Sequence, residues 1–205
     1  MAKIQELYLK SITLPNLAIN GNMEFWQRIA GNPLAITSSS VNTFSADRFC
    51  HYATGPTVKS FTAQRSTSVP DASLVGFSPR YSLQVTCNTG YSSAAGDRWI
   101  AFRASFEGND IRTIVLAGIV TFEFEFYATQ AGNYPCRIYN WAANRSYVKT
   151  FAYVAANVWQ RIRVTFPIEN VTWNTNNLQG LTFLIEDSGA TYQGSPNTWI
   201  AGDIG

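Results

Sequence analysis

Apolar residues recur at every second position in several segments of this 205-residue chain, and this period constrains the fold more than any other feature. Between residues 118 and 127, a valine and three phenylalanines alternate with threonine and two glutamates. Successive side chains of a β-strand point to opposite faces, so the pattern describes a strand that is apolar on one face and polar on the other. Such half-buried strands are typical of antiparallel sheets, and the sequence therefore predicts an all-β antiparallel sandwich.

Similar segments follow one another along the chain, separated by clusters of Gly, Pro, Asn and Ser. The predicted strands are residues 17–20, 48–53, 57–65, 80–87, 99–106, 118–127, 137–141, 147–154, 160–166 and 181–186. A single helical turn is predicted in residues 108–114, with Asn109 or Asp110 as its cap. Because no linker divides the chain, we expect one domain over residues 16–205, preceded by an N-terminal arm or first strand at residues 1–15.

Composition narrows the classes of function. Charged residues make up 14% of the chain, against about 25% in typical domains, and the net charge is +2 without any basic run, which argues against nucleic-acid binding. The first residues lack the apolar core of a signal peptide and no segment resembles a membrane span, so we expect synthesis in the cytoplasm and no membrane insertion. Cys50, Cys87 and Cys136 are predicted to be small buried hydrophobes.

Groups suited to catalysis are few. The chain has one histidine, His51, which we expect to be half-buried or on the surface, and its neighbour Cys50 would point to the opposite face of an extended segment. Glu123 and Glu125 lie on one strand face, roughly 5–8 Å apart, a spacing that glycosidases also use. The alternatives are a solvated outer face, the floor of a sugar groove or a catalytic pair. We expect the solvated outer face. The protein is accordingly expected not to be an enzyme, and no cofactor is expected.

Aromatic residues in loop-like segments are the main candidates for ligand contact. Trp141, Trp173, Tyr192 and Trp199 lie among Asn, Thr, Ser and Gly residues. An exposed ring stacks on the C–H face of a sugar while nearby polar groups bind its hydroxyls, although a ring in such a segment also often closes the edge of a core. The residues predicted to bind carbohydrate are Tyr139, Trp141, Asn144, Trp173 and Tyr192.

A structural calcium ion is the one metal for which the sequence offers ligands. Asn22, Glu24, Asp47 and Asp187 carry oxygen atoms of the kind that calcium prefers, but they form no contiguous calcium loop. Asn22 and Glu24 are the predicted ligands.

Residues 16–28, NLAINGNMEFWQR, combine an Asn-Gly turn with the aromatic pair Phe25 and Trp26. We read this segment as an opening strand and hinge, with the two rings on opposite sides and one of them in the core. The motifs that follow in order are FSADRF at 44–49, YSLQVT at 81–86, FEGNDI at 106–111, RSYV at 145–148, VWQ at 158–160, WNTNNLQGL at 173–181 and NTWIAG at 197–202. This ordered set, covering residues 16–202, resembles bacteriophage tail-fibre and other virion appendage proteins.

The resemblance implies a jelly-roll sandwich like those of carbohydrate-binding modules, displayed on a phage particle. In that family the chain continues beyond the last motif into a final strand, whereas this sequence ends at Gly205. The jelly roll then lacks its last strand, or residues 1–15, a neighbouring subunit or a longer natural chain fills the place. Because an open slot leaves an exposed sheet edge, we expect a homo-oligomer, and the resemblance to fibres suggests a trimer.

The function that the resemblance implies is a non-enzymatic virion component, on the phage tail or the capsid surface, that binds a host-surface glycan. Its expected partners are host cell-surface polysaccharide and other virion proteins, and repeated weak sites in an oligomer would supply the affinity. The alternatives are a purely structural decoration or adaptor subunit, and a glycan-degrading enzyme that uses Glu123 and Glu125.

Overall fold

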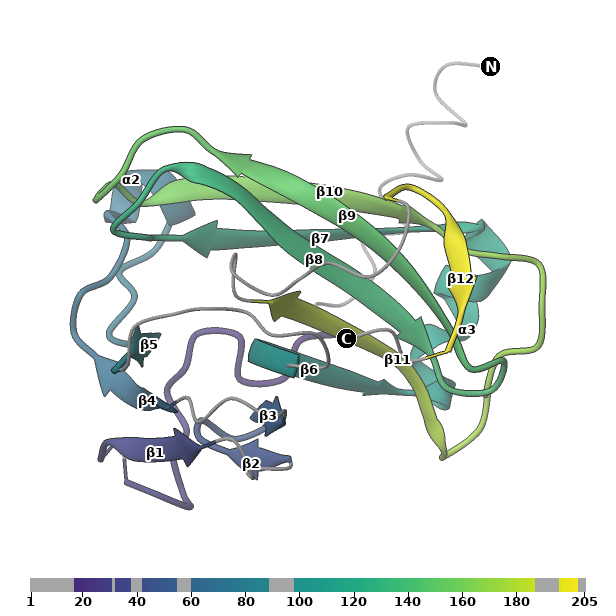
Figure 1. Cartoon of the computed structure of the whole chain (residues 1–205), viewed down its shortest axis with the longest axis horizontal. Helices are drawn as coiled ribbons and strands as arrows, with labels where there is room; N and C mark the ends of the chain where they lie inside the picture. Colours follow the sequence, from purple (N-terminus) through teal and green to yellow (C-terminus); the bar gives the residue numbers. More distant parts are fainter. Residues whose placement is uncertain are drawn as a thin grey trace.

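A computed structural model describes residues 17–30, 32–37, 42–54, 60–88, 98–186 and 196–202. Three antiparallel sheets dominate these residues, and together they confirm the predicted all-β sandwich (Figure 1). The expected arm at residues 1–15, and the candidates Tyr192 and Asp187, lie outside the described residues.

The largest sheet has seven strands and forms one layer of the sandwich. Their spatial order is β12 (Trp199–Ala201), β9 (Arg145–Tyr153), β8 (Gly132–Asn140), β11 (Gln179–Glu186), β6 (Arg98–Glu107), β3 (Phe49–Thr54) and β2 (Thr43–Phe44). The opposing layer contains the pair β7 (Ile119–Phe126) and β10 (Gln160–Pro167). A third sheet contains β1 (Leu34–Thr37), β4 (Ser60–Ser66) and β5 (Ser82–Cys87).

Phenylalanines from facing strands fill the space between the two main layers. Phe122 of β7 stacks on Phe183 of β11, with ring centroids 4.1 Å apart and planes 11° apart. Phe166 of β10 meets Phe183 edge-on, and Phe124 meets Phe151 of β9 in the same manner. The alternation that predicted the strand at residues 118–127 is thus the pattern of one inner face of the sandwich.

Helix α3 (Gly108–Ala117) joins β6 to β7 and is longer than the single turn predicted from the sequence. The predicted cap is also wrong, because the N-cap residue is Glu107 and its side chain makes no capping bond. Backbone carbonyls perform that role instead: the N–H groups of Gly108 and Asn109 donate to Leu178 O and Asn176 O, at 2.8 and 2.7 Å. The helix therefore begins where the chain before β11 meets it.

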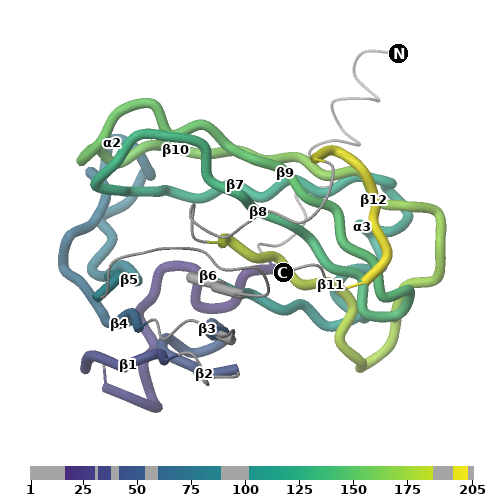
Figure 2. The backbone as a smooth tube through the Cα atoms, viewed as in Figure 1, coloured from purple at the N-terminus to yellow at the C-terminus, as the bar shows by residue number. Residues whose placement is uncertain are grey.

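A second, short helix, α2 (Ala72–Val75), was not predicted. Asp71 caps it by accepting a hydrogen bond from Ser73 N, and Gly76 ends it in the left-handed region with φ 81°. The backbone trace places α2 at the opposite end of the molecule from α3 and β12 (Figure 2).

Residues 17–28 form turns and irregular segments, so the strand predicted at residues 17–20 is wrong. Asn20 has φ 61° and organises the segment: its side chain accepts from Phe25 N at 2.9 Å and donates to Asp47 O at 3.1 Å. A side chain that bonds the local backbone competes with strand pairing. The prediction for the aromatic pair is confirmed, since Trp26 is 4% exposed in the core and Phe25 is 60% exposed.

The cysteines and the histidine differ partly from expectation. Cys50 and Cys136 are buried as predicted, but Cys87 is exposed because it lies at the end of β5. His51 is fully buried, and its Nε2 lies 2.6 Å from Ser45 Oγ. The prediction that His51 is half-buried or on the surface is therefore wrong, because the hydrogen bond to a serine hydroxyl lets the imidazole be fully buried.

Candidate functional site

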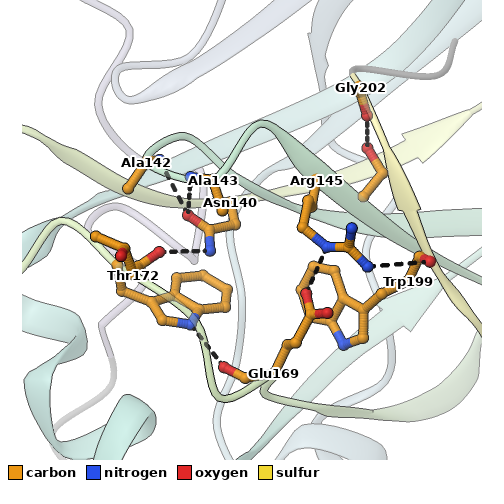
Figure 3. A network of polar contacts seen from close by, with 10 residues as sticks. Asn140, Ala142, Ala143, Arg145, Glu169, Thr172, Trp199 and Gly202 are labelled. Atoms are coloured by element: carbon orange, nitrogen blue, oxygen red, sulfur yellow. Dashed lines mark hydrogen bonds and ion pairs between the residues drawn. The ribbon is translucent and has the colours of Figure 1, made fainter.

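The turn between β8 and β9, residues 141–144, is fixed by side-chain hydrogen bonds from its flanks. Asn140 is fully buried; its Oδ1 accepts from Ala142 N and Ala143 N at 3.0 and 3.3 Å, and its Nδ2 donates to Thr172 O at 3.0 Å (Figure 3). Asn144 closes the turn with φ 51°, a conformation that asparagine tolerates better than most residues. These hydrogen bonds define the conformation of the turn.

The strands behind this turn are tied to the last described segment. Arg145 Nε lies 2.6 Å from Glu169 Oε2, and Arg145 Nη2 donates to Trp199 O (Figure 3). Ser146 Oγ donates to Gly202 O at 3.0 Å, while Gly202 N donates to Asn144 O at 2.7 Å. Three segments far apart in the sequence therefore meet behind the turn.

Trp141 occupies the first position of the turn and lies over the outer face of the large sheet. Its indole Nε1 donates to Thr182 Oγ1 of β11 at 2.8 Å, which fixes the ring across that strand. The Tyr139 ring meets it edge-on at 4.8 Å, and the Arg103 guanidinium of β6 lies 5.4 Å from the ring centroid. Trp141 is still 37% exposed, so part of this oriented ring faces solvent.

A short row of hydroxyl and amide groups runs beside the ring on the same sheet face. Ser105 and Thr182 are cross-strand partners whose hydroxyl oxygens lie 3.1 Å apart. Gln179 Nε2 donates to both hydroxyls, at 2.6 and 3.1 Å. Ser105 is exposed and Gln179 is half-buried, so this row borders the open side of the ring.

Three of the predicted site residues therefore come together in space. Trp141 supplies the exposed ring, and Tyr139, which is 7% exposed, packs edge-on against that ring. Tyr139 Oη donates to Asn144 Oδ1 at 2.6 Å, which links the support to the end of the turn. Asn144 itself is exposed.

Trp173 is a correction to the predicted site. It is 7% exposed in the main core, it meets Trp199 edge-on at 5.9 Å, and its Nε1 donates to Glu169 O at 3.0 Å. A ring whose faces are covered by other side chains does not stack on a sugar, so Trp173 closes the core. This was the alternative that the sequence left open for each aromatic residue.

Sequence reasoning missed the polar residues around Trp141. Arg103 and Ser105 occupy the outward positions of β6, between the inward Phe102, Ala104 and Phe106. That alternation is visible in the sequence. The sequence does not show, however, that β6 lies two strands away from β8, the strand that leads into Trp141. Thr182 is the one hydroxyl in the apolar strand LTFLI, and this was the remaining local signal.

Glu123 and Glu125 face outward from β7, as expected, and both are ion-paired with arginines of β10. Arg163 Nη2 lies 2.6 Å from Glu123 Oε2, and Arg161 Nε lies 2.8 Å from Glu125 Oε1. The two pairs are cross-strand neighbours in register. The arrangement is a cross-strand ladder of ion pairs, in which the Glu123 side chain is 40% exposed and the Glu125 side chain 14% exposed.

Asn22 and Glu24, the predicted calcium ligands, are both exposed. Asp47 Oδ1 accepts a hydrogen bond from Gln27 N at 3.3 Å. Within the described ranges, no group of three or more His, Cys, Asp or Glu side chains is arranged to hold a metal ion. The calcium site stays a prediction.

A groove of about 420 Å³ lies between β9 of the seven-stranded sheet and β10 of the two-stranded sheet. Among the residues that the structure describes, β10 pairs with β7 alone, so the groove follows the other edge of β10. Lys149 crosses it and donates from Nζ to Thr165 O at 2.7 Å. An inward-pointing charge of this kind blunts a sheet edge.

Comparison with known proteins gives no match: no family model, no curated protein and no solved structure is similar to this chain. In the part of the chain that the structure describes, neither helix has the length and apolar character needed to cross a membrane.

Proposed function

We propose that this protein is a non-enzymatic phage virion component whose domain binds saccharides on the host surface. The observation that carries the saccharide site is the oriented and partly exposed ring of Trp141, bordered by Ser105 and Gln179. Sugar sites combine such a ring with a few fixed polar groups, because the ring covers C–H groups and the polar groups select hydroxyls. The virion location, tail or capsid, and the jelly-roll topology rest on the order of sequence motifs.

The test is saccharide binding by the protein and two alanine variants on an array of bacterial surface polysaccharides. Trp141→Ala is expected to weaken binding at least tenfold, because about 1.4 kcal/mol of lost ring contact corresponds to a factor of ten. The control is Tyr127→Ala. Tyr127 comes directly after β7, near the start of β8, whereas Trp141 follows the end of β8. Tyr127 is 40% exposed, which is close to the 37% of Trp141.

Two outcomes contradict the proposal. The first is the absence of binding to every polysaccharide when the protein is displayed at high valency. The second is equal loss of binding in the Trp141 and Tyr127 variants, which would place the contact elsewhere.

A purely structural subunit is the second candidate, and the groove beside β10 favours it. An unpaired strand edge is a surface on which a neighbouring chain adds a strand, and the hydrogen bond from Lys149 covers one carbonyl of this edge, that of Thr165. Two measurements together decide between the candidates: the mass of the protein in solution and its binding on the polysaccharide array. A trimer that binds saccharide supports the first candidate, and an assembled protein that binds none supports the second.

A further inference from the structure

Arg103 places a positive charge over the Trp141 ring. It projects from the outward face of β6, two residues before Ser105, and its Cζ lies 5.4 Å from the ring centroid of Trp141. Its Nη1 donates to Asn42 Oδ1 at 2.5 Å, and Asn42 comes just before β2. The guanidinium is thus held in place by contacts on two sides.

Among the residues that the structure describes, no carboxylate balances the charge of Arg103. Four other arginines of the sheets are ion-paired: Arg137 with Glu186, Arg145 with Glu169, Arg161 with Glu125 and Arg163 with Glu123. Among the described residues, no acid lies within ion-pair distance of Arg103, and its buried Nε has no hydrogen-bond partner. A guanidinium beside an exposed ring, paired only with an amide, retains its affinity for an anion.

The other titratable groups around Arg103 leave this charge in place, and Glu186 of the neighbouring strand β11 is already ion-paired with Arg137. Cys50 is its cross-strand partner on β3, and burial raises the pKa of that thiol, an effect that the charge of Arg103 opposes. The thiol is therefore neutral at pH 7. Glu107 lies on the same face of β6 but four residues further along, roughly 13 Å away at about 3.3 Å per residue. This exceeds the Debye length of about 8 Å at physiological salt, so Glu107 repels an anion at Arg103 only weakly.

We infer that the saccharide taken by this site is acidic, with a carboxylate-bearing sugar placed on Trp141 and its carboxylate against Arg103. Ser105 and Gln179 then bind the hydroxyls of the same or the adjoining sugar. The planar guanidinium matches a carboxylate in geometry as well as in charge. This inference rests on the proposed saccharide function and adds the chemical class of the ligand.

The test compares the full-length protein on matched acidic and neutral ligands. The probes are polygalacturonic acid, the same polymer after reduction of its carboxyl groups, polysialic acid and a sulfated dextran. The protein is expected to prefer the two carboxylated polymers by at least tenfold, and raising sodium chloride from 50 to 500 mM is expected to weaken that binding.

Arg103→Gln is expected to weaken binding to the carboxylated polymers at least tenfold and to remove this preference and its salt dependence. Arg103→Lys keeps the charge and is expected to restore part of the preference, a result that a merely structural role would not give. Arg163→Gln, on the opposite layer, is the control and is expected to match the wild type. Thermal unfolding of each variant confirms that it is folded.

Equal binding to the acidic and reduced polymers, with no effect of Arg103→Gln, overturns the acidic ligand and leaves the saccharide function standing. Preference for the sulfated polymer over both carboxylated ones also overturns the carboxylate assignment. Absence of binding to all four polymers and to the wider array overturns the proposed function itself.

Discussion

Asn140 and Trp141 are neighbours in the chain with opposite environments, and the candidate site depends on both. Asn140 is fully buried and makes three hydrogen bonds to backbone groups, whereas Trp141 is partly exposed and carries the proposed ligand contact. A buried amide with all of its partners specifies one conformation of the turn. The position of the Trp141 ring therefore follows from the residue before it.

Asn140→Ala is expected to destabilise the protein by about 1–3 kcal/mol, because it leaves backbone groups of the turn without their partners. It is also expected to weaken saccharide binding, since the turn no longer fixes the ring. Denaturation in urea measures the first effect and the polysaccharide array the second. Asn133→Ala, at an exposed position of the same strand, is the control and is expected to change stability by less than about 0.5 kcal/mol. Equal stabilities of the two variants would show that the hydrogen bonds of Asn140 contribute little.

At the scale of elements, the contact between α3 and β11 connects the two layers at the end of the molecule that carries the site. At Gly180 of β11 the two elements pack so closely that a Cβ atom does not fit between them. A Cβ there would lie 2.6 Å from Ile111 Cδ1 and 2.8 Å from Gly108 Cα. The same strand supplies Thr182 and Gln179 to the site, so the packing of α3 positions these side chains as well.

Gly180→Ala is expected to cost about 1–3 kcal/mol of stability, the usual result of overpacking a core, because the clash with Gly108 Cα involves backbone that cannot rotate away. Gly132→Ala in β8 is the matched control, since a Cβ there meets no atom within 4 Å. The control is expected to be neutral or stabilising by up to about 1 kcal/mol. Midpoints of thermal and urea unfolding compare the two variants. A Gly180 variant as stable as the Gly132 variant would mean that α3 shifts without cost.

At the scale of the whole molecule, the core separates the three thiols into two classes. Cys136 is fully buried in β8, and burial raises the pKa of its thiol to about 12, with a smaller contribution from the charge of Glu186 that Lys149 opposes. Cys50 is buried with a raised pKa, whereas Cys87 is exposed. Reactivity requires access to the thiol, and only Cys87 among the three is exposed.

At pH 8 the folded protein is expected to react rapidly with a disulfide reagent at one thiol, Cys87, and at all three thiols only after unfolding. A Cys87→Ser variant is expected to show no rapid reaction. Because the pKa of Cys136 is higher in the folded than in the unfolded chain, its contribution to stability is complete below about pH 9 and is lost as the pH rises toward 12. Cys136→Ala is expected to reduce this alkaline loss. Rapid reaction of either remaining thiol in the Cys87→Ser protein would contradict the closed core.

The sequence by itself determined the all-β class, the long strands and the inner face of the sandwich. Residues 119–126 carry a complete period of apolar residues, so no tertiary information is needed to orient them. The same reasoning from neighbouring positions predicted that Phe25 and Trp26 point to opposite sides, with one of them in the core. The short strands β1, β2 and β12 were not predicted, because two to four residues become a strand only when a partner strand is present.

Only the tertiary structure decided which aromatic residues face solvent and which polar groups accompany them. Trp141 and Trp173 have similar sequence surroundings, but the first lies on the outer face of the sheet and the second inside the core. Arg103 and Thr182 meet Trp141 because β6, β11 and β8 are adjacent, although these strands are separated in the chain by α3, β7, β9 and β10. Local patterns fix which side of a strand is apolar. Strand order, which depends on packing across the whole chain, determines which side chains form a site.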